Sequence, residues 1–117
     1  MTKIYGIANC DTIKKTKKWL DNQHIDYRFH DFRRDGLERC TLERWCSALG
    51  WESLLNRRGT TWRKLPEALR EAVDEVTAIE LMLEQPSLIK RPVLEINGTV
   101  HVGFSESGYT EIFHIND

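Results

Sequence analysis

The first third of the chain passes from one hydrophobic pattern to another and back. Residues 4–7 form a short apolar run, and residues 12–22 place apolar side chains on one face at helical spacing. Residues 25–32 alternate apolar and polar side chains, and Asp35-Gly36 is typical of the turn after a strand. The pattern predicts a strand, a helix and a second strand, in that order.

The next segment changes to a helical pattern from residue 37 onward. Between residues 42 and 49 apolar side chains recur at i, i+3, i+4 and i+7, and Gly50 is a natural helix end. Residues 56–64 carry several basic side chains and predict a loop. A helix followed by a basic loop is therefore expected here.

Further helix starts follow the basic loop. Pro66 suits a first helical position, because proline lacks the N–H that a helix start leaves unpaired. Residues 77–80, Thr-Ala-Ile-Glu, form a capping-box pattern that predicts the opening of a short helix ending before Pro86. The middle of the chain is therefore predicted to be mostly helical.

The last part of the chain predicts two strands and a helix. Residues 93–96 and 99–104 are strand-like, and the Asn97-Gly98 pair between them is a strong signal for a tight hairpin turn. Ser105 is placed to cap a final helix. The chain thus closes with a strand-strand-helix unit.

Together these elements predict one α/β domain over residues 1–117. A strand-helix-strand half and a strand-strand-helix half, with a helical insertion at about residues 37–90, resemble the thioredoxin-like fold. Pro92 comes just before the third strand, where that fold places a cis-proline facing the active thiol. The chain has no internal repeat and no linker-like segment.

Composition narrows the classes of function. The 117 residues are 40% hydrophobic and 30% charged with a net charge of −1, which is typical of a globular protein and provides no overall attraction to nucleic acid or acidic membranes. Met1 leads directly into the first strand, and no apolar run approaches membrane-spanning length. We therefore expect a cytoplasmic protein that binds neither nucleic acid nor membranes.

Cys10 is the strongest candidate for chemistry. Three cysteines without zinc spacing are expected to be free thiols in a reducing compartment, and Cys10 stands where the first strand turns into a helix. The N–H groups and dipole of a helix start stabilise a thiolate, and Lys14 and Lys15 can assist, whereas Asp11 opposes them. We predict a lowered pKa; the alternative is a buried cysteine that packs as a small apolar side chain.

The other two cysteines have weaker claims. Cys46 falls on the apolar face of its helix and is predicted to be a core residue. Cys40 is expected near the start of that helix, in a position open to exposure, but no nearby group would activate it and a resolving role is not favoured. Position 13 is Ile13, so Cys10 has no C-x-x-C partner and must react with another molecule or a distant cysteine.

Basic residues supply candidate anion-binding groups. The loop carries Arg57, Arg58, Arg63 and Lys64. Most of this run is expected to be a solvated face, with Arg57 or Arg58 a secondary candidate for the site. Arg91 is favoured, because its neighbour Pro92 would bring the guanidinium to Cys10. The four histidines show no metal-ligand spacing, so no metal site is expected.

The sequence also resembles a known family. The segments that carry the resemblance are Tyr5-Gly6-Ile7-Ala8-Asn9-Cys10-Asp11-Thr12, Arg58-Gly59-Thr60-Thr61-Trp62-Arg63-Lys64-Leu65, Ile89-Lys90-Arg91-Pro92-Val93 and Gly103-Phe104-Ser105. Together they resemble the ArsC family nearly end to end. Within it the chain is most similar to the YffB branch, and more distantly to the Spx/MgsR regulators and the glutaredoxin-coupled arsenate reductases. The resemblance implies a thioredoxin fold and glutathione-dependent thiol reductase activity.

Two residues of this chain match functional residues of the family. Cys10 matches the nucleophilic cysteine, and Arg91 matches the arginine that helps to hold the oxyanion in the arsenate reductases. The chain departs from those reductases at residues 13–15, Ile-Lys-Lys, where they have a Ser-Arg-type anion loop, and at residues 102–104, which lack a further arginine. Ile13 also removes the C-x-x-C switch common in Spx-type regulators.

The leading hypothesis is therefore a monothiol, glutathione-dependent thiol reductase. Cys10 would attack a glutathione mixed disulfide, while Arg91, Lys14, Lys15, the Arg57-Arg58 pair and Pro92 would form the surrounding substrate site. Glutathione would be a co-substrate, with no tightly bound cofactor, and glutaredoxin a further candidate partner of a monomeric enzyme. The alternatives are arsenate reduction and a non-catalytic, Spx-like regulator that binds RNA polymerase.

Overall fold

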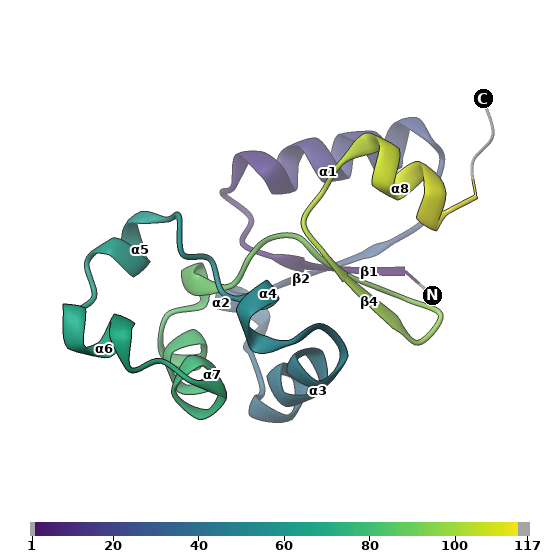
Figure 1. Cartoon of the computed structure of the whole chain (residues 1–117). Helices are drawn as coiled ribbons and strands as arrows, with labels where there is room; N and C mark the ends of the chain where they lie inside the picture. Colours follow the sequence, from purple (N-terminus) through teal and green to yellow (C-terminus); the bar gives the residue numbers. More distant parts are fainter. Residues whose placement is uncertain (1, 115–117) are drawn as a thin grey trace.

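The computed structural model describes residues 2–114, and its centre is a four-stranded mixed sheet (Figure 1). The strands are β1 (Thr2–Gly6), β2 (Arg28–Asp31), β3 (Val93–Ile96) and β4 (Thr99–Val102). They lie in the order β2-β1-β3-β4, with β1 parallel to β2 and the other neighbouring pairs antiparallel. The two central strands, β1 and β3, therefore come from opposite ends of the chain.

One face of the sheet is covered by α1 (Asp11–Asn22) and α8 (Glu106–Ile112), which lie together above it in Figure 1. The parallel pairing of β1 and β2 requires a crossover connection, and α1 provides it. Ile4 and Leu94 are paired across β1 and β3, and both are fully buried toward these helices. Trp19 of α1 contacts Tyr109 of α8 edge to face, with ring centroids 5.7 Å apart.

Helices that come between β2 and β3 in the chain cover the opposite face. They are α2 (Phe32–Asp35), α3 (Arg39–Leu49), α4 (Trp51–Leu54), α5 (Thr60–Arg63), α6 (Glu67–Glu71), α7 (Glu75–Glu84) and the 3-10 helix η1 (Pro86–Leu88). In Figure 1, α3 lies beneath the sheet, whereas α5 and α6 extend beyond its end. Tyr5 and Val93, one position along from Ile4 and Leu94, point to this face because side chains alternate along a strand.

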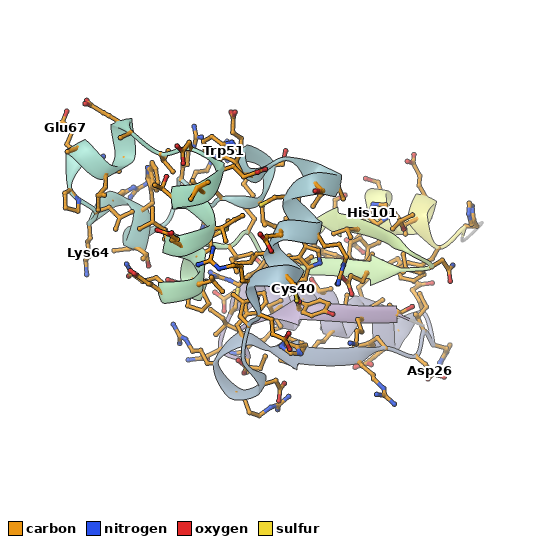
Figure 2. All side chains as sticks on the ribbon, turned by 90° about the horizontal axis from the view of Figure 1, so that it is seen from below. Asp26, Cys40, Trp51, Lys64, Glu67 and His101 are labelled. Atoms are coloured by element: carbon orange, nitrogen blue, oxygen red, sulfur yellow. The ribbon has the colours of Figure 1, made fainter. Side chains whose placement is uncertain are left out.

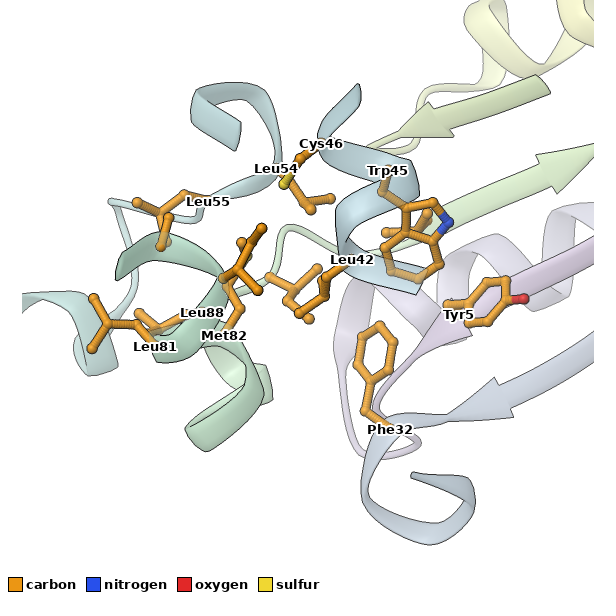
Figure 3. Packing of buried hydrophobic residues seen from close by; sticks show 14 of the residues in the cluster. Tyr5, Phe32, Leu42, Trp45, Cys46, Leu54, Leu55, Leu81, Met82 and Leu88 are labelled. Atoms are coloured by element: carbon orange, nitrogen blue, oxygen red, sulfur yellow. The ribbon is translucent and has the colours of Figure 1, made fainter. Parts of the chain in front are cut away.

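The core on this face joins the sheet to α3 and α7 (Figure 3). Trp45 is fully buried and meets the Tyr5 ring edge to face, with centroids 4.8 Å apart. Glu95 of β3 accepts hydrogen bonds from Tyr5 Oη at 2.8 Å, Trp45 Nε1 at 2.7 Å and Arg44 Nη2 at 2.6 Å. Apolar packing and one satisfied carboxylate thus fix α3 on the sheet.

Much of the predicted architecture is confirmed. The strand-helix-strand and strand-strand-helix halves of an α/β, thioredoxin-like fold are both present. Gly50 ends α3 with φ 86°, and the Asn97-Gly98 turn joins β3 to β4 with φ values of 49° and 79°. The Ser105 side chain accepts a hydrogen bond from Gly108 N at 3.0 Å and caps α8.

Several boundaries differ from the sequence prediction: β1 covers Thr2–Gly6 instead of residues 4–7, and β4 ends at Val102 instead of residue 104. The second strand begins at Arg28, where pairing with β1 starts, and ends at Asp31, whose side chain caps α2. The predicted basic loop contains α5, and Pro66 is the N-cap of α6 rather than its first residue. The capping box lies one turn earlier than predicted, because the side chains of Asp74 and Thr77 bond reciprocally to each other's backbone N–H groups.

No helix within residues 2–114 is both long enough and apolar enough to span a lipid bilayer.

Candidate functional site

Cys10 stands at the junction of β1 and α1. After β1 an exposed turn at Ala8 and Asn9 leads to Cys10, which is half-buried and is the N-cap residue of α1 with φ −129° and ψ 130°. A side chain at this position faces the first unpaired N–H groups of the helix, here those of Thr12 and Ile13. The helix therefore presents backbone donors and the positive end of its dipole to the sulfur.

Opposing influences set the acidity of the Cys10 thiol. Partial burial raises its pKa, because burial removes water from the thiolate. The pKa is lowered most by a hydrogen bond from the Ile13 N–H. The hydrogen bond and positive charge of the Arg91 side chain lower it further, as does the Thr12 N–H. These lowering influences outweigh the effect of burial, so the pKa of Cys10 lies below that of an ordinary thiol. A lowered pKa is also what the sequence predicts.

Arg91 comes to the thiol from the segment that precedes β3. Its peptide bond to Pro92 is cis, and Pro92 is buried. Arg91 Nη1 donates a hydrogen bond to the carbonyl oxygen of Ser87 at 2.9 Å. Its Nε is buried and has no hydrogen-bond partner within residues 2–114. The guanidinium is thus anchored at Nη1, and its hydrogen bonding and positive charge lower the pKa of Cys10.

Asp31 fixes the turn that leads to Cys10. Its buried carboxylate accepts a hydrogen bond from Ala8 N at 3.3 Å, and from Arg33 N and Arg34 N at 2.8 and 3.4 Å. Burial raises the pKa of Asp31, but these N–H donors outweigh it and hold the pKa below its usual value. One ionised side chain therefore both caps α2 and ties the Cys10 turn to the end of β2.

The other predicted site residues lie in different settings. Lys14 and Lys15 are exposed on α1 after Cys10. Arg57 packs its guanidinium over the Trp51 and Trp62 rings, 5.4 and 5.9 Å from their centroids. Arg58 is exposed, and its backbone N–H donates to Asn56 Oδ1 at 3.1 Å. Of the predicted residues, Arg91 is therefore the one whose side chain acts directly on the sulfur of Cys10.

Comparison with known proteins now identifies the family. The family model described as "ArsC family" matches residues 5–112. This chain belongs to the ArsC family. A solved structure named YffB protein is 51% identical, covers 95% of this chain and 97% of its own, and superposes with a TM-score of 0.90.

Two further relatives extend the comparison of this ArsC-family chain. A solved structure of an arsenate reductase (ArsC) related protein from Brucella melitensis is 53% identical, covers 97% of this chain and 95% of its own, and has a TM-score of 0.80. The regulatory protein MgsR of Bacillus subtilis is 30% identical over 105 residues, which are 87% of this chain and 82% of MgsR. The family thus has relatives named for two different functions.

The other cysteines of the ArsC-family chain differ sharply from Cys10. Cys46 is 4% exposed in the core, as predicted, and its burial, followed by the nearby Glu75 and Glu43 carboxylates, raises the pKa of its thiol. Cys40 is exposed at the start of α3, which lies in front of the sheet in Figure 2 while α1 lies behind it. Since α1 and α3 cover opposite faces, the chain provides no neighbouring thiol on the helix that Cys10 caps.

Among residues 2–114 no three His, Cys, Asp or Glu side chains are grouped in a way that could hold a metal ion. Sequence reasoning missed two contributors to the site, Asp31 and the Ser87 carbonyl. An aspartate immediately before Phe32-Arg33-Arg34 is an N-cap pattern, but the alternation of residues 25–32 favoured an uninterrupted strand. A backbone carbonyl leaves no signal in the side-chain pattern.

Proposed function

We propose that this ArsC-family chain is a monothiol, glutathione-dependent thiol reductase whose nucleophile is Cys10. The observation that supports it most is the setting of the sulfur, which faces helix N–H donors and the Arg91 guanidinium and has a lowered pKa. Thiolate is the form that attacks disulfides, so a lowered pKa raises the reactive fraction near neutral pH.

The reaction proceeds in two exchanges. The Cys10 thiolate attacks the glutathione sulfur of a mixed disulfide; a Cys10–glutathione disulfide forms, and the substrate leaves as a thiolate that takes a proton from water. A second glutathione, as its thiolate, attacks the glutathione sulfur bound to Cys10, which releases oxidised glutathione and restores the Cys10 thiolate. The net reaction is therefore an exchange in which the mixed disulfide and one free glutathione thiol give the substrate thiol and oxidised glutathione.

Basic residues hold the anionic partner in this proposal. Glutathione carries carboxylates, and the positive charge of the Arg91 guanidinium, which lowers the pKa of Cys10, attracts such an anion toward the reacting sulfur. Lys14 and Lys15 add positive charge on the exposed side of α1. The Arg57-Arg58 pair is a more distant contributor, because Arg57 is already packed on two tryptophans.

The test uses a small glutathione mixed disulfide, reduced glutathione and coupled detection of oxidised glutathione. We expect turnover by the native chain, its loss in Cys10→Ser, and its retention in the matched variant Cys40→Ser, which alters an exposed thiol. Mass spectrometry after oxidised glutathione treatment should place one glutathione on Cys10. A folded protein with no adduct at Cys10 and no turnover would overturn the proposal.

Arsenate reduction is the second candidate, favoured by the similarity to the arsenate reductase related protein of Brucella melitensis and by the positive charge that Arg91 contributes at Cys10. Arsenate, reduced glutathione and glutaredoxin, supplied in the same assay, distinguish the two. Arsenite production that depends on Cys10 and exceeds turnover of the mixed disulfide would make arsenate the preferred substrate.

A further inference from the structure

The backbone that carries Arg91 is held by the helical region. Leu88 and Ile89 are fully buried. The Leu88 carbonyl accepts a hydrogen bond from Asn56 N at 2.6 Å, and Lys90 N donates to the Leu54 carbonyl at 2.8 Å. The chain thus runs from η1 to Arg91 along the segment that joins α4 to α5, and it is hydrogen-bonded there at two points that follow Ser87.

Ser87 connects this segment to both α5 and Arg91. Its carbonyl oxygen accepts the hydrogen bond from Arg91 Nη1 at 2.9 Å. Its hydroxyl shares a hydrogen bond with the Thr61 hydroxyl, with the two oxygens 2.7 Å apart. Thr61 is half-buried and belongs to α5. Hydrogen bonds therefore connect Thr61 to Ser87 and Ser87 to Arg91, the residue whose side chain lowers the pKa of Cys10.

We propose that Thr61 is a positioning residue that sets the Arg91 guanidinium against Cys10 through Ser87. The proposal rests on the proposed function, in which Arg91 stabilises the Cys10 thiolate. It also gives a role to Thr61, which lies in the Arg58–Leu65 segment.

The physical reason is the flexibility of arginine. Its long side chain loses much rotamer freedom when it is ordered, so a guanidinium with a fixed anchor stabilises a neighbouring anion better than a mobile one. The Ser87 carbonyl is that anchor, and the Thr61 hydroxyl holds the residue that presents it. Removal of the hydroxyl leaves the buried Leu88 and Ile89 in place, so the change is local.

The experiment measures Cys10 alkylation by iodoacetamide as a function of pH, with peptide mass spectrometry to separate Cys10 from Cys40 and Cys46. Thr61→Val keeps the size and β-branching of threonine but removes the hydroxyl. We expect its alkylation midpoint to rise, with roughly threefold slower reaction well below the midpoint, consistent with a shift of about half a pH unit. Thr61→Ser, which keeps a hydroxyl, should restore the native profile.

Thr60→Val is the matched control. Thr60 is the preceding residue of α5, is exposed, and makes no side-chain hydrogen bond within the described residues, so its variant should keep the native profile. In an Arg91→Met background Thr61→Val should have no further effect, because Thr61 acts through the guanidinium. A native profile for Thr61→Val, or an equal shift without Arg91, overturns the proposal.

The outcome is independent of whether the enzyme uses glutathione, since alkylation needs no substrate. A native alkylation profile in every Thr61 variant, combined with glutathione turnover, contradicts the positioning role alone. A shifted profile without any turnover supports the positioning role and contradicts the proposed function. Near-ultraviolet circular dichroism of each variant confirms that the comparison is made on folded protein.

Discussion

The two faces of the sheet bury very different cores. Within residues 2–114, six buried residues form the core under α1 and α8, whereas sixteen form the core that the sheet shares with the helical region between β2 and β3. Since apolar burial is the main favourable contribution to folding, the second face carries more of the stability. The smaller core is built around aromatic contacts, with Trp19, Tyr109 and Phe104 in mutual edge-to-face pairs.

The two groups of the candidate site are divided between these cores. Cys10 packs against the smaller core and caps its main helix. Arg91 follows Leu88 and Ile89, which belong to the larger core. The thiol and the cation that stabilises it therefore depend on different cores. Destabilising substitutions in the two cores should affect the site in different ways.

The largest expected effect is in the larger core, at Trp45. Trp45→Ala would leave a cavity beneath the sheet and remove one of the donors to Glu95, at a cost of about 3–5 kcal/mol in the free energy of unfolding. Trp45→Phe, which keeps an aromatic ring, should cost less. Urea denaturation measures the free energy of unfolding of both variants. A loss under about 1 kcal/mol for Trp45→Ala would show that α3 adds little to stability.

The smaller core is tested at Gly6, where β1 passes beneath α1. A Cβ at this position would collide with the fully buried Ile13 side chain, so Gly6→Ala should cost about 1–3 kcal/mol. The Ile13 N–H also stabilises the Cys10 thiolate, so this variant should raise the pKa of Cys10. Ile13→Val removes the nearest carbon atom, and a double-mutant cycle in urea should show partial rescue. Additive losses would contradict the steric explanation.

These two regions also differ in how well the sequence predicts them. The smaller core follows from local patterns, because the helix after Cys10, the Asn97-Gly98 turn and the Ser105 cap each have a short-range signature. The helical region is less predictable. Its boundaries depend on tertiary contacts and side-chain caps, such as the pairing that starts β2 at Arg28 and the Asp74 cap one turn before the predicted box.

The same division applies to the site. Cys10 could be found from its position before a helix, and Arg91 from its place before Pro92. Asp31 and Ser87 could not, since one acts across the sheet on Ala8 and the other through a backbone carbonyl. Long-range hydrogen bonds of this kind depend on the packed fold and have no fixed spacing along the chain.

A smaller effect compares the two buried tyrosines. Tyr5 Oη donates to Glu95 in the larger core, whereas Tyr109 Oη is buried without a hydrogen-bond partner among residues 2–114. Tyr5→Phe should therefore cost about 1 kcal/mol, while Tyr109→Phe should be neutral or stabilising, because an unpaired buried hydroxyl is unfavourable. Thermal and urea unfolding measure both. A clear loss for Tyr109→Phe would show that its hydroxyl is satisfied in solution.

The smallest effect expected is the pH dependence that Cys10 gives to folding. Its pKa is lower in the folded protein than in the unfolded chain, so the unfolded chain binds more protons between the two values and stability rises with pH there. The contribution is complete above the unfolded pKa of about 8.5 and is lost as the pH falls through the folded pKa. The measurement is the unfolding free energy of the native chain minus that of Cys10→Ser, from about pH 6 to about pH 9.5. Cys46 is present in both proteins, so its contribution to the pH dependence cancels in this difference. Arg91→Met should flatten the rise, because the guanidinium helps to lower the pKa; a difference that falls with increasing pH would contradict a stabilised thiolate.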